Sequence, residues 1–139
     1  MGTYADEREV VANVLDGFTA GVPILWPDTE GEPPAPGSNP TAPVSYLLAE
    51  VEYDNAQPSD FGGGGQIDGR VVVWAWVERN AGDLLCRQHI DTLRSLFAAG
   101  DDTTQAMYFL EAFAGPAQVG GEGGEWYGRR VEIPFTRFR

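Results

Sequence analysis

The residues QIDGRVVVWAWVE (66–78), RNAG (79–82) and DLLCRQHIDTLRSLFAAG (83–100) decide the fold of this chain. In a strand, alternate side chains point to opposite faces. One face of the first segment carries Val72, Trp74 and Trp76, and the other carries Val71, Val73, Ala75 and Val77. A run that is apolar on both faces is typical of a strand covered twice. The sequence therefore predicts a strand at the centre of a sheet or beneath a partner subunit.

The segment that follows predicts a helix from Asp83 to Ala99. Its apolar residues recur at helical spacing, and they are Cys86, Ile90, Leu93 and Phe97, flanked by Leu85, His89 and Leu96. We expect the Asp83 carboxylate to cap the first free amides at the positive end of the helix dipole, and Gly100 to end the helix. Strand and helix together mark the position of the core.

Composition narrows the class of protein. The 139 residues predict one domain, 1–139, with an ordinary core, since 42% of them are apolar. A single cysteine excludes an internal disulfide and a cysteine-based metal cluster, so the chain is compatible with a reducing cytoplasm. We expect no metal or other cofactor. The acidic first residues contain no apolar segment, so we expect no secretory signal. No apolar run is long enough to span a bilayer, and we expect no membrane contact.

The net charge of −12 is the most unusual bulk property. It argues against a protein that binds nucleic-acid phosphates, because such proteins carry a basic surface. An acidic surface keeps a protein soluble, which is one interpretation. The other is an acidic wall past which DNA slides without sticking. Composition leaves both interpretations open.

A helix, a short strand and a long loop are expected first along the chain. The helix runs from Thr3 to Phe18, and the strand covers 22–26. The apolar stripe of this helix consists of Val10, Val11, Val14, Leu15 and Phe18. Residues 27–43 hold six of the ten prolines and predict an extended surface loop. A polyproline ligand for another protein is the alternative for this loop.

A second alternating segment, 45–54, predicts another strand. Its core face carries Leu47, Ala49, Val51 and Tyr53, and its other face carries Glu50, Glu52 and Asp54. We expect these acids to face water or an interior channel. Residues 58–66, with Phe61 and then Gly62, Gly63, Gly64 and Gly65, predict a flexible hairpin tip. A phosphate-binding loop is excluded there, because the glycines lead into a strand and no lysine is nearby.

Two more strands are expected after the second helix, at 105–113 and 125–138. In the last strand Tyr127, Val131, Ile133 and Phe135 mark the core side, and Arg130, Glu132 and Thr136 lie opposite. The fold class is therefore α+β, a mostly antiparallel sheet of about four to five strands with two main helices on one face.

The end of the chain is basic although the chain as a whole is acidic. The four arginines there are Arg129, Arg130, Arg137 and Arg139. They suggest a contact with an acidic neighbouring subunit, or else a solvated edge strand protected by charge. Trp74 and Trp76 are expected in the core or at the same subunit interface.

Candidate chemistry is sparse. Cys86 and His89 lie three residues apart on one helix face, as a thiolate–imidazole pair would require, but both fall within the apolar stripe. One cysteine and one histidine cannot complete a zinc site. Glu50, Glu52 and Asp54 invite a paired-carboxylate hydrolase or a Ca²⁺ site, yet no second acid cluster converges on them. We therefore expect no catalytic residues and no enzyme.

The arrangement of segments resembles the tail terminator (tail-completion) proteins of long-tailed bacteriophages and gene transfer agents. The resemblance covers nearly the whole chain and combines element order with a few short motifs. These are Ile24 to Asp28 (ILWPD) before the proline-rich loop, Ser45 to Tyr53 before the glycine-rich tip, Gly69 to Val73 (GRVVV), Ala81 to Asp83 (AGD), Leu93 to Phe97 (LRSLF), and the final strand from Trp126 through Val131 to Phe135 (VEIPF). The long loop 27–43 departs from the family pattern, as does the scarcity of basic residues near the tip, where Arg70 stands alone.

The resemblance implies a structural virion protein, assembled in the host cytoplasm and located at the tail–neck junction. A hexameric ring would cap the tail tube, meet the head–tail connector or adaptor protein, and let DNA pass without sequence-specific binding. Within that picture Glu50, Glu52 and Asp54 would line the lumen, and residues 61–65 would form a docking loop. The subunit interface would include Trp74, Trp76, Arg129, Arg130 and Arg137. The alternatives are a neck or head-closure connector protein and a small hydrolase using Cys86 and His89.

Overall fold

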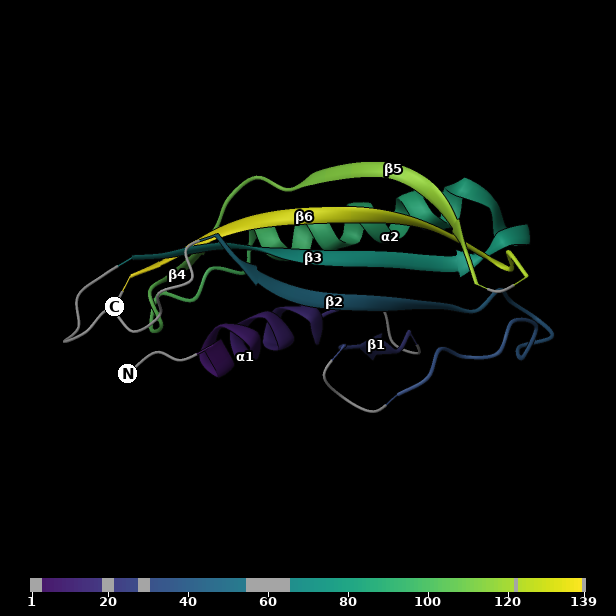
Figure 1. Cartoon of the computed structure of the whole chain (residues 1–139), viewed down its shortest axis with the longest axis horizontal. Helices are drawn as coiled ribbons and strands as arrows, with labels where there is room; N and C mark the ends of the chain where they lie inside the picture. The colour runs from purple at the N-terminus through teal and green to yellow at the C-terminus, as the bar shows by residue number, and fades with distance from the viewer. Residues whose placement is uncertain (1–3, 19–21, 28–30, 55–65, 122, 139) are drawn as a thin grey trace.

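The computed structural model describes residues 4–18, 22–27, 31–54, 66–121 and 123–138. Its elements are α1 (Tyr4–Leu15), β1 (Ile24–Leu25), β2 (Ser45–Tyr53), β3 (Gln66–Glu78), the 3₁₀ turn η1 (Arg79–Ala81), α2 (Gly82–Ala98), β4 (Met107–Phe109), β5 (Phe113–Gly120) and β6 (Trp126–Phe138). The six strands form one sheet, in which the order of neighbours is β1-β2-β3-β6-β4. β5 also pairs with β6, along a part of β6 that precedes the part paired with β4. Every pairing is antiparallel except that of β1 with β2. The α+β class is confirmed (Figure 1).

β3 is the central strand, as predicted. It pairs with β2 from Gly69 to Val77 on one side, and with β6 over its whole length on the other. Its side chains at positions 71, 73, 75 and 77 are fully buried. The valine-rich sequence forms a strand here because β-branched side chains pack well on a pleated surface that is covered.

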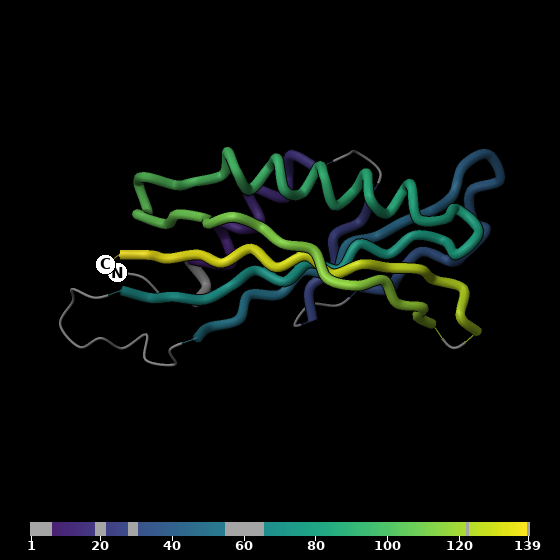
Figure 2. The backbone as a smooth tube through the Cα atoms, turned by 90° about the horizontal axis from the view of Figure 1, so that it is seen from above, coloured from purple at the N-terminus to yellow at the C-terminus, as the bar shows by residue number. Residues whose placement is uncertain are grey.

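Both helices pack on one face of the sheet, also as predicted (Figure 2). The apolar stripes of α1 and α2 join one core with the inward-facing residues of β2, β3 and β6. The ends of the two helices lie close together: a Cβ atom added at Gly17, just after α1, would lie 3.0 Å from Leu96 of α2, and one added at Gly100, just after α2, would lie 2.9 Å from Val14 of α1. None of the described helices is long and apolar enough to cross a membrane.

The strand predicted at 105–113 is wrong in its extent. The structure has a short strand, β4, and then β5, which the sequence did not reveal. β5 contains Pro116, and its pairing with β6 shifts between Ala114 and Ala117. Proline lacks the amide hydrogen that a ladder needs, so it is tolerated at edge strands and irregularities of this kind. The weak apolar alternation of β5 follows from its place at the edge.

The capping role predicted for Asp83 is also corrected. The residue at the N-cap of α2 is Ala81, and no side chain caps the helix there. The Asp83 carboxylate instead accepts hydrogen bonds from the Tyr127 hydroxyl and from Arg129 Nε, the latter at 3.0 Å. The Tyr127 hydroxyl, followed by the Arg129 guanidinium, holds the pKa of Asp83 well below its ordinary value. Asp83 therefore fastens the start of α2 to β6.

A buried ion pair fastens α1 to the same strand. Arg137 of β6 binds the Glu7 carboxylate of α1, and both side chains are almost fully buried. The Tyr53 hydroxyl donates to the other Glu7 oxygen at 3.1 Å, and Arg137 also donates to the Gln105 carbonyl at 3.0 Å. Charged groups tolerate burial only when paired and hydrogen-bonded in this way.

The described part of the proline-rich loop, 31–43, contains no helix or strand, in agreement with the prediction. It is held to the sheet by Glu78 at the end of β3. The Glu78 carboxylate accepts hydrogen bonds from the amides of Gly37, at 2.7 Å, and Val44, at 3.2 Å. The loop is therefore anchored at two points.

Candidate functional site: the open sheet face

The sheet face opposite the helices carries the remaining side chains of the three long strands. We call this surface the open face, because among the described residues no helix lies on it (Figures 1 and 2). From β2 it takes Tyr46, Leu48, Glu50 and Glu52, from β3 Arg70, Val72, Trp74 and Trp76, and from β6 Trp126, Gly128, Arg130 and Glu132. Its residues fall into an aromatic half and a charged half.

Two tryptophans dominate the aromatic half. The rings of Trp74 and Trp76 stack with centroids 5.1 Å apart and planes within 10°. Trp76 lies over Gly128 of β6, where an added Cβ atom would approach its ring to 2.3 Å. It also reaches Gly120 of β5, where an added Cβ atom would come within 2.9 Å. The two glycines thus provide the space in which the Trp76 ring lies across the sheet.

Both tryptophan side chains remain partly exposed although their neighbours are buried. Tyr46 and Trp126, at the same end of the sheet, pack edge to face with centroids 4.9 Å apart. A contiguous aromatic surface that keeps some exposure is characteristic of sites that bind another macromolecule.

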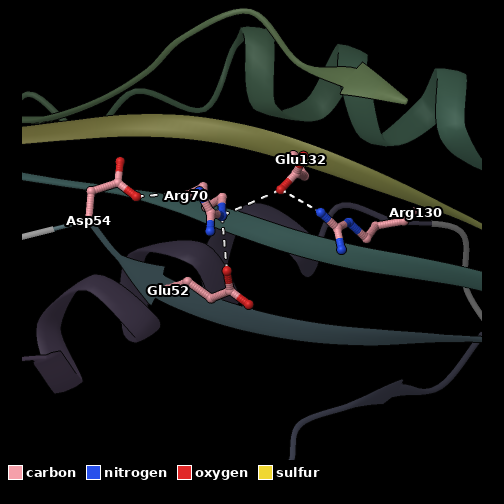
Figure 3. Close-up of polar contacts among 5 residues, drawn as sticks. All are labelled: Glu52, Asp54, Arg70, Arg130 and Glu132. Carbon is pink, nitrogen blue, oxygen red and sulfur yellow. Dashed lines mark hydrogen bonds and ion pairs between the residues drawn. The ribbon is translucent and has the colours of Figure 1, made fainter. Parts of the chain in front are cut away.

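The charged half is built around Arg70 (Figure 3). Arg70 Nε lies 2.9 Å from Glu52 Oε1 and 3.4 Å from Glu132 Oε1, and its Nη1 lies 3.4 Å from Asp54 Oδ1. Arg130 Nη2 extends the network with a 2.8 Å contact to Glu132. The hydrogen bond to Glu52 raises the pKa of Arg70 above its ordinary value. Arg70 thus contacts three carboxylates, those of Glu52 in β2, Asp54 just after β2, and Glu132 in β6.

The acidic set predicted from sequence is divided by this network. Glu52 and Asp54 come together at Arg70, whereas Glu50 is exposed and lies opposite Val72 of β3. The face is therefore a mixed-charge surface with an excess of acid, and the expected wall of negative charge is interrupted by Arg70 and Arg130. The sequence places Glu132 opposite the core side of the last strand but does not predict its contact with Arg70, because only the register of β6 against β3 brings the two together.

The interface set predicted from sequence is also divided. Trp74, Trp76 and Arg130 share the open face, but Arg129 and Arg137 point to the helix side. Arg137 is buried against Glu7, and Arg129 is paired with Asp83. Both charges are used within the subunit, so we remove these two residues from the interface. Arg139 and the predicted docking loop, with Phe61, Gly62, Gly63, Gly64 and Gly65, lie outside the described residues.

Cys86 and His89 have separate partners. The Cys86 thiol is fully buried and donates to the Ala75 carbonyl at 3.4 Å, and burial raises its pKa to about 11. His89 Nε2 is hydrogen-bonded to Ser45 Oγ at 2.9 Å, its ring packs edge-on against Phe18, and burial lowers its pKa. A buried neutral thiol is a poor nucleophile, so this geometry suits core packing better than catalysis.

Among the residues that the structure describes, no group of three or more His, Cys, Asp or Glu side chains is placed to hold a metal ion. The carboxylates of Glu52, Asp54 and Glu132 are instead paired with Arg70.

No model of a known protein family matches the chain, and a comparison with curated proteins finds no match.

Proposed function

We propose that this protein is a structural subunit of a phage virion, a tail terminator that forms a ring at the end of the tail tube. The observation that carries the proposal is the open face, where a stacked tryptophan pair adjoins a partly exposed ion-pair network. We interpret this surface as part of a tail terminator because the order of segments and the short motifs resemble those of tail terminator proteins. The ring would join the tail tube protein to the head–tail connector.

The aromatic half supports the idea of a subunit contact. Tryptophan and arginine are enriched among the residues that dominate protein–protein interfaces. Trp74, Trp76 and Arg130 lie together, and the aromatic rings are already ordered by stacking before any partner binds. A preordered surface loses little side-chain entropy on association. We assign these three residues to the contact between neighbouring subunits.

The charged half supports the idea of a lumen through which DNA passes. Glu50 is exposed, and the network around Arg70 contains three carboxylates against two guanidinium groups. A ring would repeat this excess of acid around its axis and repel the DNA phosphates, since binding them requires the opposite charge. The charged half of the open face is therefore our candidate for the lumen wall.

Tube assembly tests the proposed role directly. Tail tube protein is polymerised with and without this protein, and tube ends are viewed by electron microscopy. We expect a ring at one end of each tube and no further growth from that end. Tubes that grow equally in both samples, with bare ends, would overturn the proposal.

The lumen assignment has its own test. In a virion that carries this protein, Glu50, Glu52 and Asp54 are replaced by lysine. We expect rings and particles to assemble while DNA delivery falls, because phosphates would then be held in the channel. Normal delivery from normally assembled particles would count against the lumen assignment and leave the ring untouched.

A further inference from the structure

A groove separates the two helices on the side of the molecule opposite the open face. Its volume is about 790 Å³, and it is bounded by α1, α2 and the turn that follows α2. The apolar floor consists of Val10, Val14 and Leu96. Val10 is buried in the core, and Val14 and Leu96 pack against it, so the floor is fixed by the fold. This volume lies within the range of clefts that bind ligands in proteins.

The charged residues that line this groove are all acidic. They are Asp91 of α2 and Asp101 and Asp102 of the following turn. Asp101 Oδ1 accepts from the Phe109 amide at 2.8 Å, and Asp102 Oδ1 accepts from the Gln105 amide at 3.0 Å. These bonds hold both carboxylates at the rim and leave one oxygen of each carboxylate for a partner. The Asp91 carboxylate has no hydrogen-bond or ion-pair partner among the described residues.

We propose that this groove binds a basic amphipathic segment of another protein, with apolar side chains on Val14 and Leu96 and lysine or arginine at the three aspartates. Charge complementarity selects this occupant, because an acidic segment would meet only like charge at the rim. The inference does not depend on the virion role, since it concerns the opposite side of the molecule.

A second copy of this chain does not fit the groove. Its basic residues are all arginines, and Arg70, Arg129, Arg130 and Arg137 are paired on the sheet within the subunit. Arg87 is paired with Asp83 on the helix surface, Arg8 lies over the Trp26 ring, and Arg79 donates to the Gly124 carbonyl, which leaves Arg94 as a single further arginine on α2. No described segment of the chain therefore presents several unpaired basic side chains beside exposed apolar ones. The partner is a different protein.

The experiment uses fluorescent amphipathic peptides and the full chain. One peptide is built from leucine and lysine, and the other replaces every lysine with glutamate. Binding is followed by fluorescence anisotropy at physiological and high salt. We expect the lysine peptide to bind with salt-dependent affinity, and the glutamate peptide not to bind.

Two groove variants and one matched control make the test specific. Asp91→Lys reverses a rim charge, and Ser95→Trp fills the groove without changing the charge. Glu32→Lys makes the same charge change as Asp91→Lys at an exposed position of the proline-rich loop, outside the groove lining. We expect both groove variants to weaken lysine-peptide binding about tenfold, and the control to weaken it less than about threefold.

Equal loss in Asp91→Lys and Glu32→Lys would show general attraction to an acidic protein and would overturn the proposal. So would unchanged binding in Ser95→Trp, or the absence of binding by the lysine peptide. A change of native mass in the groove variants would assign the groove to contacts between copies of the chain, which also contradicts the proposal. Circular dichroism confirms that each variant is folded.

Discussion

The role of Arg137 is determined by the fold and not by its local sequence. By sequence it is one of four arginines at a basic end of the chain, and it invites an intermolecular role. In the structure it is buried on the core side of β6, bound to Glu7 of α1. Only the pairing of a helix at the start of the chain with a strand at its end makes this contact, so no local pattern could have predicted it.

This pair gives a prediction for stability. Replacing Arg137 with methionine leaves the Glu7 carboxylate buried without its cation, and we expect a loss of about 3–5 kcal/mol in the free energy of unfolding. Urea denaturation measures this loss. The matched control is Arg87→Met, because the Arg87 side chain is 65% exposed in its pair with Asp83. This substitution should lower the free energy of unfolding by less than about 1 kcal/mol. Similar losses in the two variants would contradict the buried role of Arg137.

Cys86 gives a prediction for pH dependence. Burial raises the pKa of its thiol to about 11 from an ordinary value of 9.0, so the folded state holds the proton more tightly than the unfolded state. The stability gained in this way is fully present below pH 9.0 and is lost as pH rises toward the folded pKa.

Thermal unfolding of wild type and Cys86→Ala, compared between pH 7 and 10, isolates this contribution from those of the tyrosines. We expect the stability difference between the two proteins to shrink above about pH 9. A thiol-labelling reagent should also react slowly with Cys86 in the native state and quickly in urea. Rapid labelling of the native thiol would contradict the packed role and revive the hydrolase alternative.

At the scale of elements, periodic segments were predictable and irregular ones were not. The helix 83–99 and the strand 66–78 were found because their apolar residues recur at helical and strand spacing over a long stretch. β5 was missed because an edge strand buries few residues and Pro116 interrupts its pattern.

The candidate site was predictable only in part, for a related physical reason. Alternation along one strand correctly places Trp74 with Trp76, and Glu50 with Glu52, on one face. It cannot give the register between strands, and that register brings Glu132 and Arg130 to the network of Arg70. The mixed charge of the open face is therefore a property of the assembled sheet.

The contact between β3 and β6 gives a prediction at this scale. Gly128→Ala places a methyl group against the Trp76 ring, where the available distance is 2.3 Å. We expect a loss of about 1–3 kcal/mol in the free energy of unfolding and a change in tryptophan fluorescence, because the stack with Trp74 must shift. In the control Gly115→Ala the nearest atom lies at 3.5 Å, so both effects should be small. An unperturbed fluorescence spectrum in Gly128→Ala would contradict the packing of Trp76 over β6.

At the scale of the whole molecule, the fold presents two unlike surfaces. The open face combines stacked tryptophans with an ion-pair network, and the helix side carries an apolar groove with an acidic rim. The two lie on opposite sides of one sheet, so a partner on one need not obstruct a partner on the other. Such an arrangement suits a subunit that contacts copies of itself and a different protein within one assembly.

The central claim is that the open face joins copies of this chain into a ring, and native mass tests it most directly. Light scattering of the purified protein is recorded alone and after mixing with tail tube protein. The variant Trp74→Glu places a charge in the proposed contact, and Leu84→Glu places one at a position on α2 that is 69% exposed. We predict a mass of about six subunits for wild type and Leu84→Glu, either alone or on the tube, and a folded monomer for Trp74→Glu. A wild-type protein that stays monomeric and ignores the tube protein, or a Trp74→Glu variant that assembles normally, would contradict the claim.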